Sequence, residues 1–393
     1  MIEGSCPWVI FATRAKLAKS WQKARGVAQL KIVHYLPHLL AEERGTSNAV
    51  RGWCQALAGQ GAKVACLVDE SMVRLAPPEG FDCVALRHRG RGIGRYPLGV
   101  EEQLDGADVF VVHGGWQLGN IVAARHARRR GVPFIVTTQG VYNPIVFTRR
   151  PAIKKMWAVL LERRHLTRAL AVHVFFEDER EGLERLGVSV PTVAAPNGVS
   201  PPEGLTWDGG SGGYLLWLGR FDPVNKGLDL VVRALALLEP DTRPHVRLHG
   251  PDWRNQKQVV RDLVAELGLE AWVDVGDPIY DRAKWDTIAR AAACVYPSRW
   301  DACPVAVAES ASLGVPTLVA DYPLGRFLGA KGAAVVADLT PEDVARGITR
   351  VLEEGTKFGA RAAEIARAEL AWPSVAQSWL DQVEDLLARE LST

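Results

Sequence analysis

The sequence has 393 residues, more than one hydrophobic core usually holds, so we expect two domains. Hydrophobic residues make up 48% and charged residues 23% of the chain, which excludes disordered, fibrous and coiled-coil proteins, and no apolar run reaches the ~20 residues that a membrane-spanning helix needs. The net charge of +2 conceals an asymmetry, because residues 1–200 hold 27 Lys and Arg against 17 Asp and Glu, whereas residues 201–393 hold 20 against 28.

The basic first half fits either an anionic partner or a solvated basic face. Its positive charges are spread over helices without interleaved aromatic residues, which argues against a nucleic-acid partner. The six cysteines are scattered, with no CxxC pair and no histidine cluster at ligand spacing. We therefore expect a cytoplasmic protein without a zinc site or a disulfide framework.

The first thirty residues differ from the rest of the chain. The apolar run at 8–12 is too short for a signal sequence, and the basic residues follow it rather than precede it. We expect residues 1–30 to lie outside the fold. A poorly ordered leader or an early start codon is preferred over an amphipathic surface helix.

From Lys31 onward, short apolar runs alternate with segments of helical length. Nearly continuous apolar strands of this kind indicate parallel sheets that are buried on both faces. The first series predicts strands at 31–36, 63–68, 108–113, 134–138 and 171–176. A second series predicts strands at 214–219, 246–250, 273–276, 293–298 and 317–321.

Between the two series, residues 196–213 are rich in Gly, Pro and Ser, which is linker composition. The sequence therefore predicts two doubly wound α/β domains that face a ligand-binding cleft. We place the first at 31–200, the linker at 201–212 and the second at 213–372. Apolar residues at helical spacing predict a last helix at 373–393, which we assign to the first domain on the resemblance described below.

Arg220 and Lys226 flank a turn at the end of the strand 214–219. A helix begins directly after this turn. Two cations at the carboxyl end of a parallel strand, beside a helix N-terminus, favour a diphosphate site. Taken singly, each is more often an ordinary surface residue.

A second candidate site follows the strand at 293–298. Pro304 is expected at the first position of a helix, whose free N–H groups at Val305 and Ala306 favour phosphate. Asp301 precedes this helix, and Glu309, eight residues later, lies inside it, where a carboxylate can accept hydrogen bonds from a ribose diol. Asp301 alone would fit a capping acid equally well.

The third candidate is His113, at the carboxyl end of the strand 108–113; a structural histidine is an equal alternative. Residues 45–48 (Gly-Thr-Ser-Asn) are expected to form a tight loop in which Gly45 approaches a ligand. The P-loop motif, the GxSxG elbow and the HExxH motif are missing from the sequence.

In the order of these motifs the sequence resembles retaining glycosyltransferases of the GT-B fold, glycosyltransferase family 4, from Lys31 to the C-terminus. The resemblance rests on Gly45, His113, Pro196–Val199, Gly219-Arg220, Lys226-Gly227, Gly250 and the acidic pair Asp301 and Glu309.

The resemblance implies catalytic roles for His113, Arg220, Lys226 and Asp301. Arg220 and Lys226 would hold the donor diphosphate, Asp301 the donor sugar, and Glu309 the ribose. The donor-binding set that it implies is Gly45, Asn197, Arg220, Lys226, Gly250, Ile279, Asp301, Cys303, Val305, Ala306 and Glu309. Two departures stand out: Asp301 replaces the family's usual Glu, and Ala302-Cys303-Pro304 replaces a Gly-aromatic-Gly sequence, with Pro304 lacking an N–H.

We therefore expect a retaining hexosyltransferase that uses a nucleotide-diphosphate sugar, with UDP favoured over GDP. It would need no metal or cofactor and act on a glycan, a lipid-linked sugar or a small metabolite. The alternative is a catalytically silent sugar-nucleotide or glycan-binding protein of the same fold. Apolar and basic residues interleave at 147–157, followed by Arg163, Arg164 and Arg168, which raises peripheral attachment to the inner face of the cell membrane as a further hypothesis. The preferred alternative is a helix that packs its apolar stripe on the sheet and shows a basic outer face.

Overall fold

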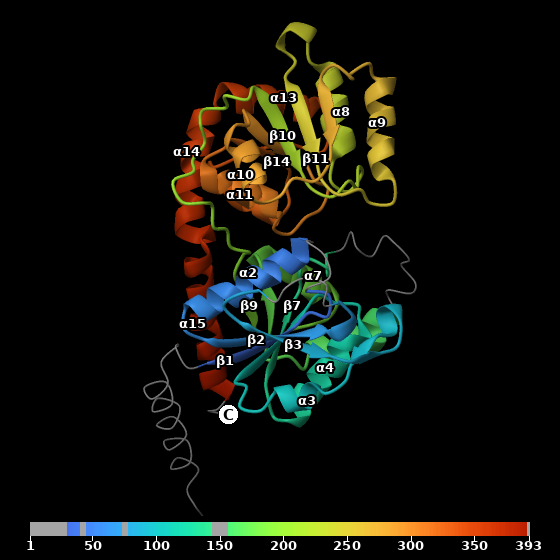
Figure 1. The fold of residues 1–393 in the computed structure, drawn as a ribbon, viewed down its shortest axis with the longest axis vertical. Helices are drawn as coiled ribbons and strands as arrows, with labels where there is room; N and C mark the ends of the chain where they lie inside the picture. The colour runs from blue at the N-terminus through green and yellow to red at the C-terminus, as the bar shows by residue number, and fades with distance from the viewer. Residues whose placement is uncertain (1–29, 40–44, 73–77, 144–155, 391–393) are drawn as a thin grey trace, which may run out of the picture. The chain divides into compact units, whose positions relative to one another are not determined.

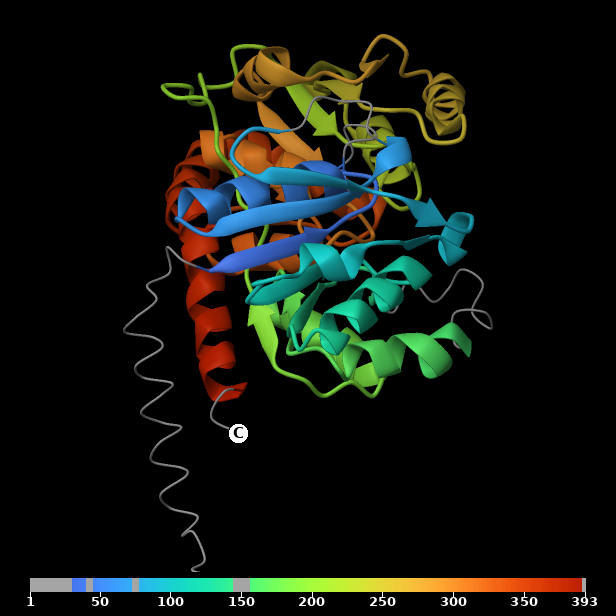
Figure 2. The same ribbon diagram turned by 60° about the horizontal axis from the view of Figure 1, so that its bottom comes forward.

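The computed structural model describes residues 30–39, 45–72, 78–143 and 156–390 (Figures 1 and 2). The expected leader lies outside these residues apart from Leu30, and so does the stretch 147–155. The chain divides into two compact units: unit 1 comprises Met1–Gly198 and Trp372–Thr393, and unit 2 comprises Val199–Ala371.

Unit 1 is built on a seven-stranded parallel sheet with the order β3-β2-β1-β6-β7-β8-β9. Its strands are β1 (Lys31–Tyr35), β2 (Lys63–Asp69), β3 (Asp82–Leu86), β6 (Val109–His113), β7 (Phe134–Thr137), β8 (Ala171–Val174) and β9 (Thr192–Ala194). A two-stranded ribbon of β4 (His88–Arg89) and β5 (Tyr96–Pro97) lies outside this sheet.

Helices cover both faces of the unit 1 sheet. One face packs against α2 (Gly45–Gly59) and α15 (Trp372–Glu390), and α15 contacts both α2 and β9. The other face packs against α3 (Val100–Gln103), α4 (Leu118–Arg129), α6 (Arg163–Leu166) and α7 (Arg180–Arg185). A π-helical turn, η5 (Ala158–Glu162), leads directly into α6.

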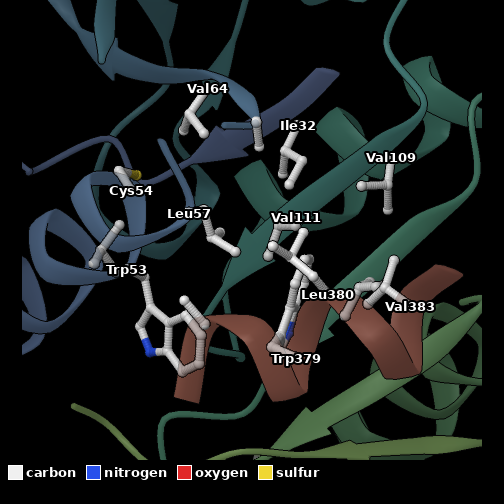
Figure 3. Close-up of a cluster of buried hydrophobic side chains, with 14 of the residues drawn as sticks. Ile32, Trp53, Cys54, Leu57, Val64, Val109, Val111, Trp379, Leu380 and Val383 are labelled. Carbon is white, nitrogen blue, oxygen red and sulfur yellow. The ribbon is translucent and has the colours of Figure 1, made fainter. Parts of the chain in front are cut away.

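The core under α2 and α15 joins the beginning and the end of the chain. Figure 3 shows Trp53 and Leu57 of α2, Trp379 and Leu380 of α15 and the strand residue Val111 in one buried cluster. Trp53 and Trp379 are each about 98% buried or more, with ring centroids 6.3 Å apart. Burial of such side chains stabilises the fold by roughly 1.5–3 kcal/mol each, so α15 is an integral part of unit 1.

Unit 2 has a six-stranded parallel sheet with the order β12-β11-β10-β13-β14-β15. Its strands are β10 (Tyr214–Leu218), β11 (His245–His249), β12 (Val273–Gly276), β13 (Ala293–Tyr296), β14 (Thr317–Val319) and β15 (Val335–Val336). Its helices are α8 (Leu228–Leu237), α9 (Gln256–Glu266), α10 (Asp281–Ala289), α11 (Val305–Leu313), α12 (Pro323–Ala330), α13 (Pro341–Glu353) and α14 (Gly355–Ile365), followed by the π-helical turn η8 (Ala366–Leu370).

All ten predicted strands are present, which confirms the expectation of two doubly wound α/β sheets. Residues 201–212, which the sequence predicts to be a linker, fall within unit 2. The backbone N–H groups of Trp207, Asp208 and Gly212 donate to the carbonyls of Leu313, Ala289 and Arg290, respectively. The Gly and Pro residues of this segment form turns that pack against unit 2, so the segment is not a flexible linker.

Candidate active site

The two sheets share one topological feature. In each, the strand order reverses beside the first strand, between β1 and β6 in unit 1 and between β10 and β13 in unit 2. Ligands of open α/β sheets bind at the carboxyl ends of strands at such a switch point. The predicted residues Arg220 and Asp301 follow β10 and β13, so they lie at the switch point of unit 2.

Two glycines allow the loops at this edge to approach each other. A Cβ on Gly250, after β11, would lie 1.6 Å from the carbonyl oxygen of Gly219, after β10. Gly227 has φ +68°, and a Cβ there would lie 1.9 Å from the carbonyl oxygen of Pro297. Only glycine fits at both positions, because backbone and not a movable side chain occupies the space. Gly250 therefore shapes the site through its backbone.

The turn 220–227 is braced against the segment that follows β13. Arg299 makes a bidentate ion pair with Asp229, with N···O distances of 2.6 and 2.7 Å. Its backbone N–H and the hydroxyl of Ser298 both donate to the carbonyl of Asn225, at 2.9 and 3.0 Å. These bonds fix the turn that carries Arg220 and Lys226.

Lys226 and Asp301 form an ion pair at the centre of this edge. The Tyr296 hydroxyl also donates to Asp301, at 3.1 Å. The side chains of Lys226 and Asp301 keep 15% and 21% of their surface exposed, so solvent and ligands reach both. The structure thus brings together two residues that the sequence places 75 positions apart.

Arg220 lies at the open side of the same edge. Its guanidinium group stacks over the ring of Trp253, 4.4 Å from the ring centroid, and its side chain is 44% exposed. Its guanidinium group pairs with Asp222 at an N···O distance of 3.9 Å. An arginine that is oriented by an aromatic ring and only weakly paired retains N–H groups for a phosphate.

The α11 helix begins one residue later than the sequence predicts. Pro304 is its N-cap residue, not its first helical residue, and its carbonyl accepts the first bonds from Val307 and Ala308, at 3.1 and 3.2 Å. The missing N–H of Pro304 therefore removes no donor from the first turn. Val305 and Ala306 precede these bonds, so their N–H groups point out of the helix end, as at other anion-binding helix termini.

Glu309 lies on α11 and forms an ion pair with Lys284 of α10. It is 7% exposed, and this burial raises the pKa of its carboxyl group, while the charge of Lys284 opposes the rise. Lys284 therefore favours the ionised form of a buried carboxylate. Sequence reasoning missed Lys284, because nothing in the spacing of the two residues signals the contact.

Two further predicted residues of unit 2 lie just before helices: Cys303 before α11 and Ile279 before α10. Cys303 is buried directly before the N-cap of α11. Ile279 is partly buried before α10 and packs against the cluster that includes Cys294 and Ile288. Their donor-binding roles stay predictions.

Three predicted site residues belong to unit 1. His113 ends β6, at the switch point of that sheet, and is 2% exposed. Its Nε2 atom is 2.9 Å from Nδ1 of His34, a residue that sequence reasoning missed. Burial, followed by the nearby histidines, lowers the pKa of His113 well below its ordinary value, so its ring is neutral.

The other two residues differ from expectation in their surroundings. Residues 45–48 form the first turn of α2, not a loop, and the buried face of this helix begins with Ser47 and Ala49. Gly45 is the first residue of α2 and is exposed. Asn197 is 5% exposed, and its side-chain oxygen accepts a hydrogen bond from Nε1 of Trp53, at 3.0 Å.

Within the described residues, no group of three His, Cys, Asp or Glu side chains is arranged to hold a metal ion. No helix in the described part of the chain combines the length and apolar character required to cross a bilayer.

Comparisons with known proteins agree with this architecture. Residues 44–198 match the "Glycosyl transferase 4-like domain" and residues 210–369 match "Glycosyl transferases group 1". No curated protein matches the sequence.

Solved structures share the fold at low sequence identity. Sucrose-phosphate synthase from Thermosynechococcus elongatus has 17% identity and a TM-score of 0.73, over 92% of this chain and 100% of that one. Anabaena HepE, in complex with UDP and glucose, has 15% identity and a TM-score of 0.72, over 91% and 100%. WaaG, a glycosyltransferase involved in lipopolysaccharide biosynthesis, has 13% identity and a TM-score of 0.64, over 91% and 99%.

Two parallel α/β sheets and these structural neighbours define the GT-B, Rossmann-like fold. With both glycosyl transferase domains matched in order, the chain is a GT-B glycosyltransferase.

Proposed function

We propose that the protein is a retaining hexosyltransferase that moves a sugar from a nucleotide-diphosphate sugar to a hydroxyl group of a glycan, a lipid-linked sugar or a small metabolite. The observation that carries the proposal is the group at the unit 2 switch point: Arg220 over Trp253, Lys226 paired with Asp301, and the N-terminus of α11. Cations and free N–H groups at one sheet edge suit a diphosphate.

The role of each residue follows from its surroundings. Lys226, Arg220 and the N–H groups of Val305 and Ala306 stabilise the negative charge that develops on the leaving diphosphate. A phosphate that binds Lys226 competes with Asp301, which frees the Asp301 carboxylate to accept hydrogen bonds from the donor sugar. Glu309, whose ionised form Lys284 favours, accepts hydrogen bonds from the ribose hydroxyls.

UDP is the proposed nucleotide, with GDP as the alternative. The HepE structures hold UDP, UDP with glucose, or UDP-glucose, and the structure of TarM, 9% identical, holds UDP. Retention of the anomeric configuration fits a front-face displacement in which the leaving phosphate accepts the proton of the acceptor hydroxyl. No metal or cofactor takes part in the proposed reaction.

A melting-temperature screen with UDP-, GDP-, ADP- and dTDP-sugars tests this proposal. A ligand that binds only the folded state raises the melting temperature, by an amount that grows with its concentration relative to Kd. The preferred donor should stabilise the wild-type protein and fail to stabilise Lys226→Ala. Release of the nucleotide in the presence of an acceptor then separates an enzyme from a catalytically silent sugar-nucleotide-binding protein, which binds the donor without turnover.

The segment 156–168, which is helical as far as Leu166, supports a second proposal: the protein is cytoplasmic and attaches to the inner face of the cell membrane through unit 1. Met156, Val159 and Leu160 are 59–69% exposed. Arg164 and Arg168 are exposed on the same segment, and partial desolvation followed by the charges of Arg164 and Arg128 lowers the pKa of Arg168. Apolar residues beside clustered arginines match an anionic lipid surface.

Co-sedimentation with vesicles that contain anionic lipid tests the membrane proposal. We expect binding at low salt and release at high salt, because screening weakens the arginine contribution of about 1 kcal/mol per charge. Val159→Ser with Leu160→Ser should weaken binding, whereas neutral vesicles should bind poorly. Failure to bind anionic vesicles at low salt would favour a freely diffusing acceptor, such as a small metabolite.

A further inference from the structure

Glu162 is a buried carboxylate that joins three segments of unit 1. It is 1% exposed and is the last residue of the π-helical turn η5. Its Oε1 atom accepts hydrogen bonds from the backbone N–H of Trp116, at 3.2 Å, and from the hydroxyl of Tyr142, at 2.5 Å, while its Oε2 atom accepts one from Nε1 of Trp157, at 2.9 Å. These three donors lie after β6, after β7 and directly before η5, respectively.

The π-helical turn brings Trp157 and Glu162 to the same side of their helix. The two residues are five positions apart, and in a regular α-helix side chains at that spacing point about 140° away from each other around the axis. A π-helical turn is closed by hydrogen bonds between residues five apart, which places such residues together. Turns of this kind are rare and are frequent at functional sites.

The loop after β6 packs directly on the Glu162 carboxylate. A Cβ on Gly115 would lie 2.8 Å from Oε1 of Glu162 and 2.4 Å from the hydroxyl oxygen of Tyr142, so a larger residue there would displace this bonded pair. Trp116 has φ +63°, a conformation that residues other than glycine rarely adopt. Its Nε1 atom donates to the carbonyl of Val141, at 3.0 Å. Bonds from its backbone and its ring therefore hold Trp116 in this conformation.

The three donors to Glu162 are uncharged groups. Burial raises the pKa of its carboxyl group, while the hydrogen bonds from Tyr142, Trp157 and the backbone of Trp116 oppose the rise. Burying a charge opposes folding unless its partners compensate, and apolar groups of the same shapes could fill this space at no greater cost. The two oxygens of a carboxylate, however, fix three donors in one geometry. This points to a role in geometry more than in stability.

The loop that Glu162 holds lies at the switch point of the unit 1 sheet. β6 is one of the two strands at this point, and ligands of open α/β sheets bind at the loops that follow such strands. Gly114, Gly115 and Trp116 are each partly exposed, so a ligand can reach the loop. Glu162 is buried beneath it and can act on a ligand only through the loop.

We propose that Glu162 is a positioning residue for the transfer reaction. It holds the loop 114–116 in the conformation that contacts the substrate bound by unit 1, without touching the substrate itself. This role in catalysis rests on the proposed function, whereas the control of the loop by Glu162 does not.

Amide hydrogen exchange, followed by NMR, tests the control of the loop without any substrate. Glu162→Leu keeps about the volume of the side chain and removes both acceptor oxygens. In this variant the Trp116 amide should exchange about tenfold faster than in wild type, the effect of losing one hydrogen bond. The amides of β6 should keep their wild-type rates. Unchanged exchange at Trp116, or equally faster exchange throughout β6, would overturn the proposal.

Steady-state kinetics with the preferred donor tests the role in catalysis. Glu162→Leu should lower kcat about tenfold, while the Kd for UDP, whose proposed site lies in unit 2, should stay within about twofold of wild type. Glu162→Gln should recover most of kcat, because its carbonyl oxygen can still accept from Trp116 and Tyr142 and only Trp157 loses its acceptor. Wild-type kcat in folded Glu162→Leu, or no recovery in Glu162→Gln, would reduce Glu162 to a structural residue.

The matched control is Asp108→Ala, at the opposite end of β6. Oδ2 of Asp108 accepts a hydrogen bond from the backbone N–H of Lys31, at 2.9 Å, directly before β6 begins. This variant should leave kcat within about twofold of wild type. Equal losses of kcat in Asp108→Ala and Glu162→Leu would assign the effect to the stability of unit 1 and overturn the role in catalysis.

The two measurements also separate this role from the proposed function. Wild-type protein that neither binds UDP nor turns over any nucleotide sugar would overturn the proposed function, and with it the role of Glu162 in catalysis. The exchange rate of the Trp116 amide would still decide whether Glu162 controls the loop.

Discussion

At the scale of single residues, the unit 2 site depends on charges held by contacts that are far apart in the sequence. Lys226 and Asp301 are partners across 75 positions, and Lys284 and Glu309 across 25. Each pair joins a lysine to a carboxylate. When a nucleotide binds, either side chain can exchange its ion-pair partner for a group of the nucleotide. The effects of substitutions there should appear in binding and turnover more than in stability.

Lys226→Ala and Arg220→Ala should each lower turnover by roughly a hundredfold or more, the effect of removing one preorganised group that stabilises developing charge. Both side chains are partly exposed, so the melting temperature should change little. Steady-state kinetics with the preferred donor provides the measurement. The control is Arg233→Ala, on the exposed side of α8. Turnover near wild type in either folded variant would remove that residue from the mechanism.

Glu309→Gln should weaken UDP binding by about 1.5–3 kcal/mol, the contribution of hydrogen bonds to a charged group. A UDP analogue that lacks both ribose hydroxyls should lose much less, because it makes no such bonds. Calorimetric titration of both ligands measures the difference. Equal weakening would show that Glu309 is only the structural partner of Lys284.

At the scale of helices and strands, α15 extends the unit 1 core although it comes last in the sequence. Val375, Trp379, Leu380 and Val383 are buried on one side of α15, as Figure 3 shows for three of them. The opposite side, including Ser378, is exposed. The helix therefore contributes a single apolar stripe to the sheet of unit 1.

Trp379→Ala should destabilise unit 1 by about 3–5 kcal/mol, since it removes a large, fully buried ring. Scanning calorimetry should show a lower melting temperature for one transition and no change in the other, because Trp379 contacts unit 1 alone in the described core clusters. Ser378→Ala, on the same helix, should leave both transitions in place. A parallel shift of both transitions would mean that the units unfold as one.

Sequence patterns predicted the sheets well because buried parallel strands are nearly continuous in apolar residues. They missed β3, whose residues Asp82–Leu86 are mostly not fully buried and read as an ordinary loop. They also missed β9 and β15, which have only three and two residues.

The candidate site was only partly predictable. Arg220, Lys226 and Asp301 could be placed at strand ends, where parallel strands present their loops to one edge. Lys284 and His34 could not, because a lysine on a polar helix and a histidine in an apolar strand carry no local sign of their partners. Asn197 likewise gave no sign of its bond to Trp53, 144 positions away.

At the scale of the whole molecule, the buried histidines are concentrated in unit 1. Burial lowers the pKa of His34 to about 3 and those of His165 and His173 to about 4, and lowers that of His113 strongly. In unit 2, His245 is exposed and His249 is partly exposed. The two units should therefore respond differently to acid.

Unit 1 should lose stability as the pH falls from about 6.5 to about 4.5. Unfolded histidines bind protons below pH ~6.5, whereas the four buried ones do not, so the unfolded state takes up more protons in this window. Glu162 and Glu179, whose pKa values are raised by burial, oppose part of this loss by binding protons in the folded state.

The four buried histidines outnumber these two acids, so we expect a net loss of stability for unit 1 as the pH falls through this window. Calorimetry at pH 7.0, 6.0 and 5.0 should move its transition downward more than that of unit 2. His165→Phe should reduce the pH dependence of unit 1 stability by the contribution of one buried histidine. A melting temperature of unit 1 that does not change with pH would contradict the inference that its buried histidines are neutral.

The placement of α15 also sets the order in which the chain can fold as it is made. Unit 2 is a continuous insertion between Gly198 and Trp372, so the ribosome delivers all of it before the last helix of unit 1 emerges. Until then, the apolar surface around Trp53 and Val111 has no cover from Trp379 and Leu380. A nascent chain that stops short of residue 372 should contain a complete unit 2 and an incomplete unit 1. Because this unit 1 exposes apolar surface, we expect chaperones to bind it.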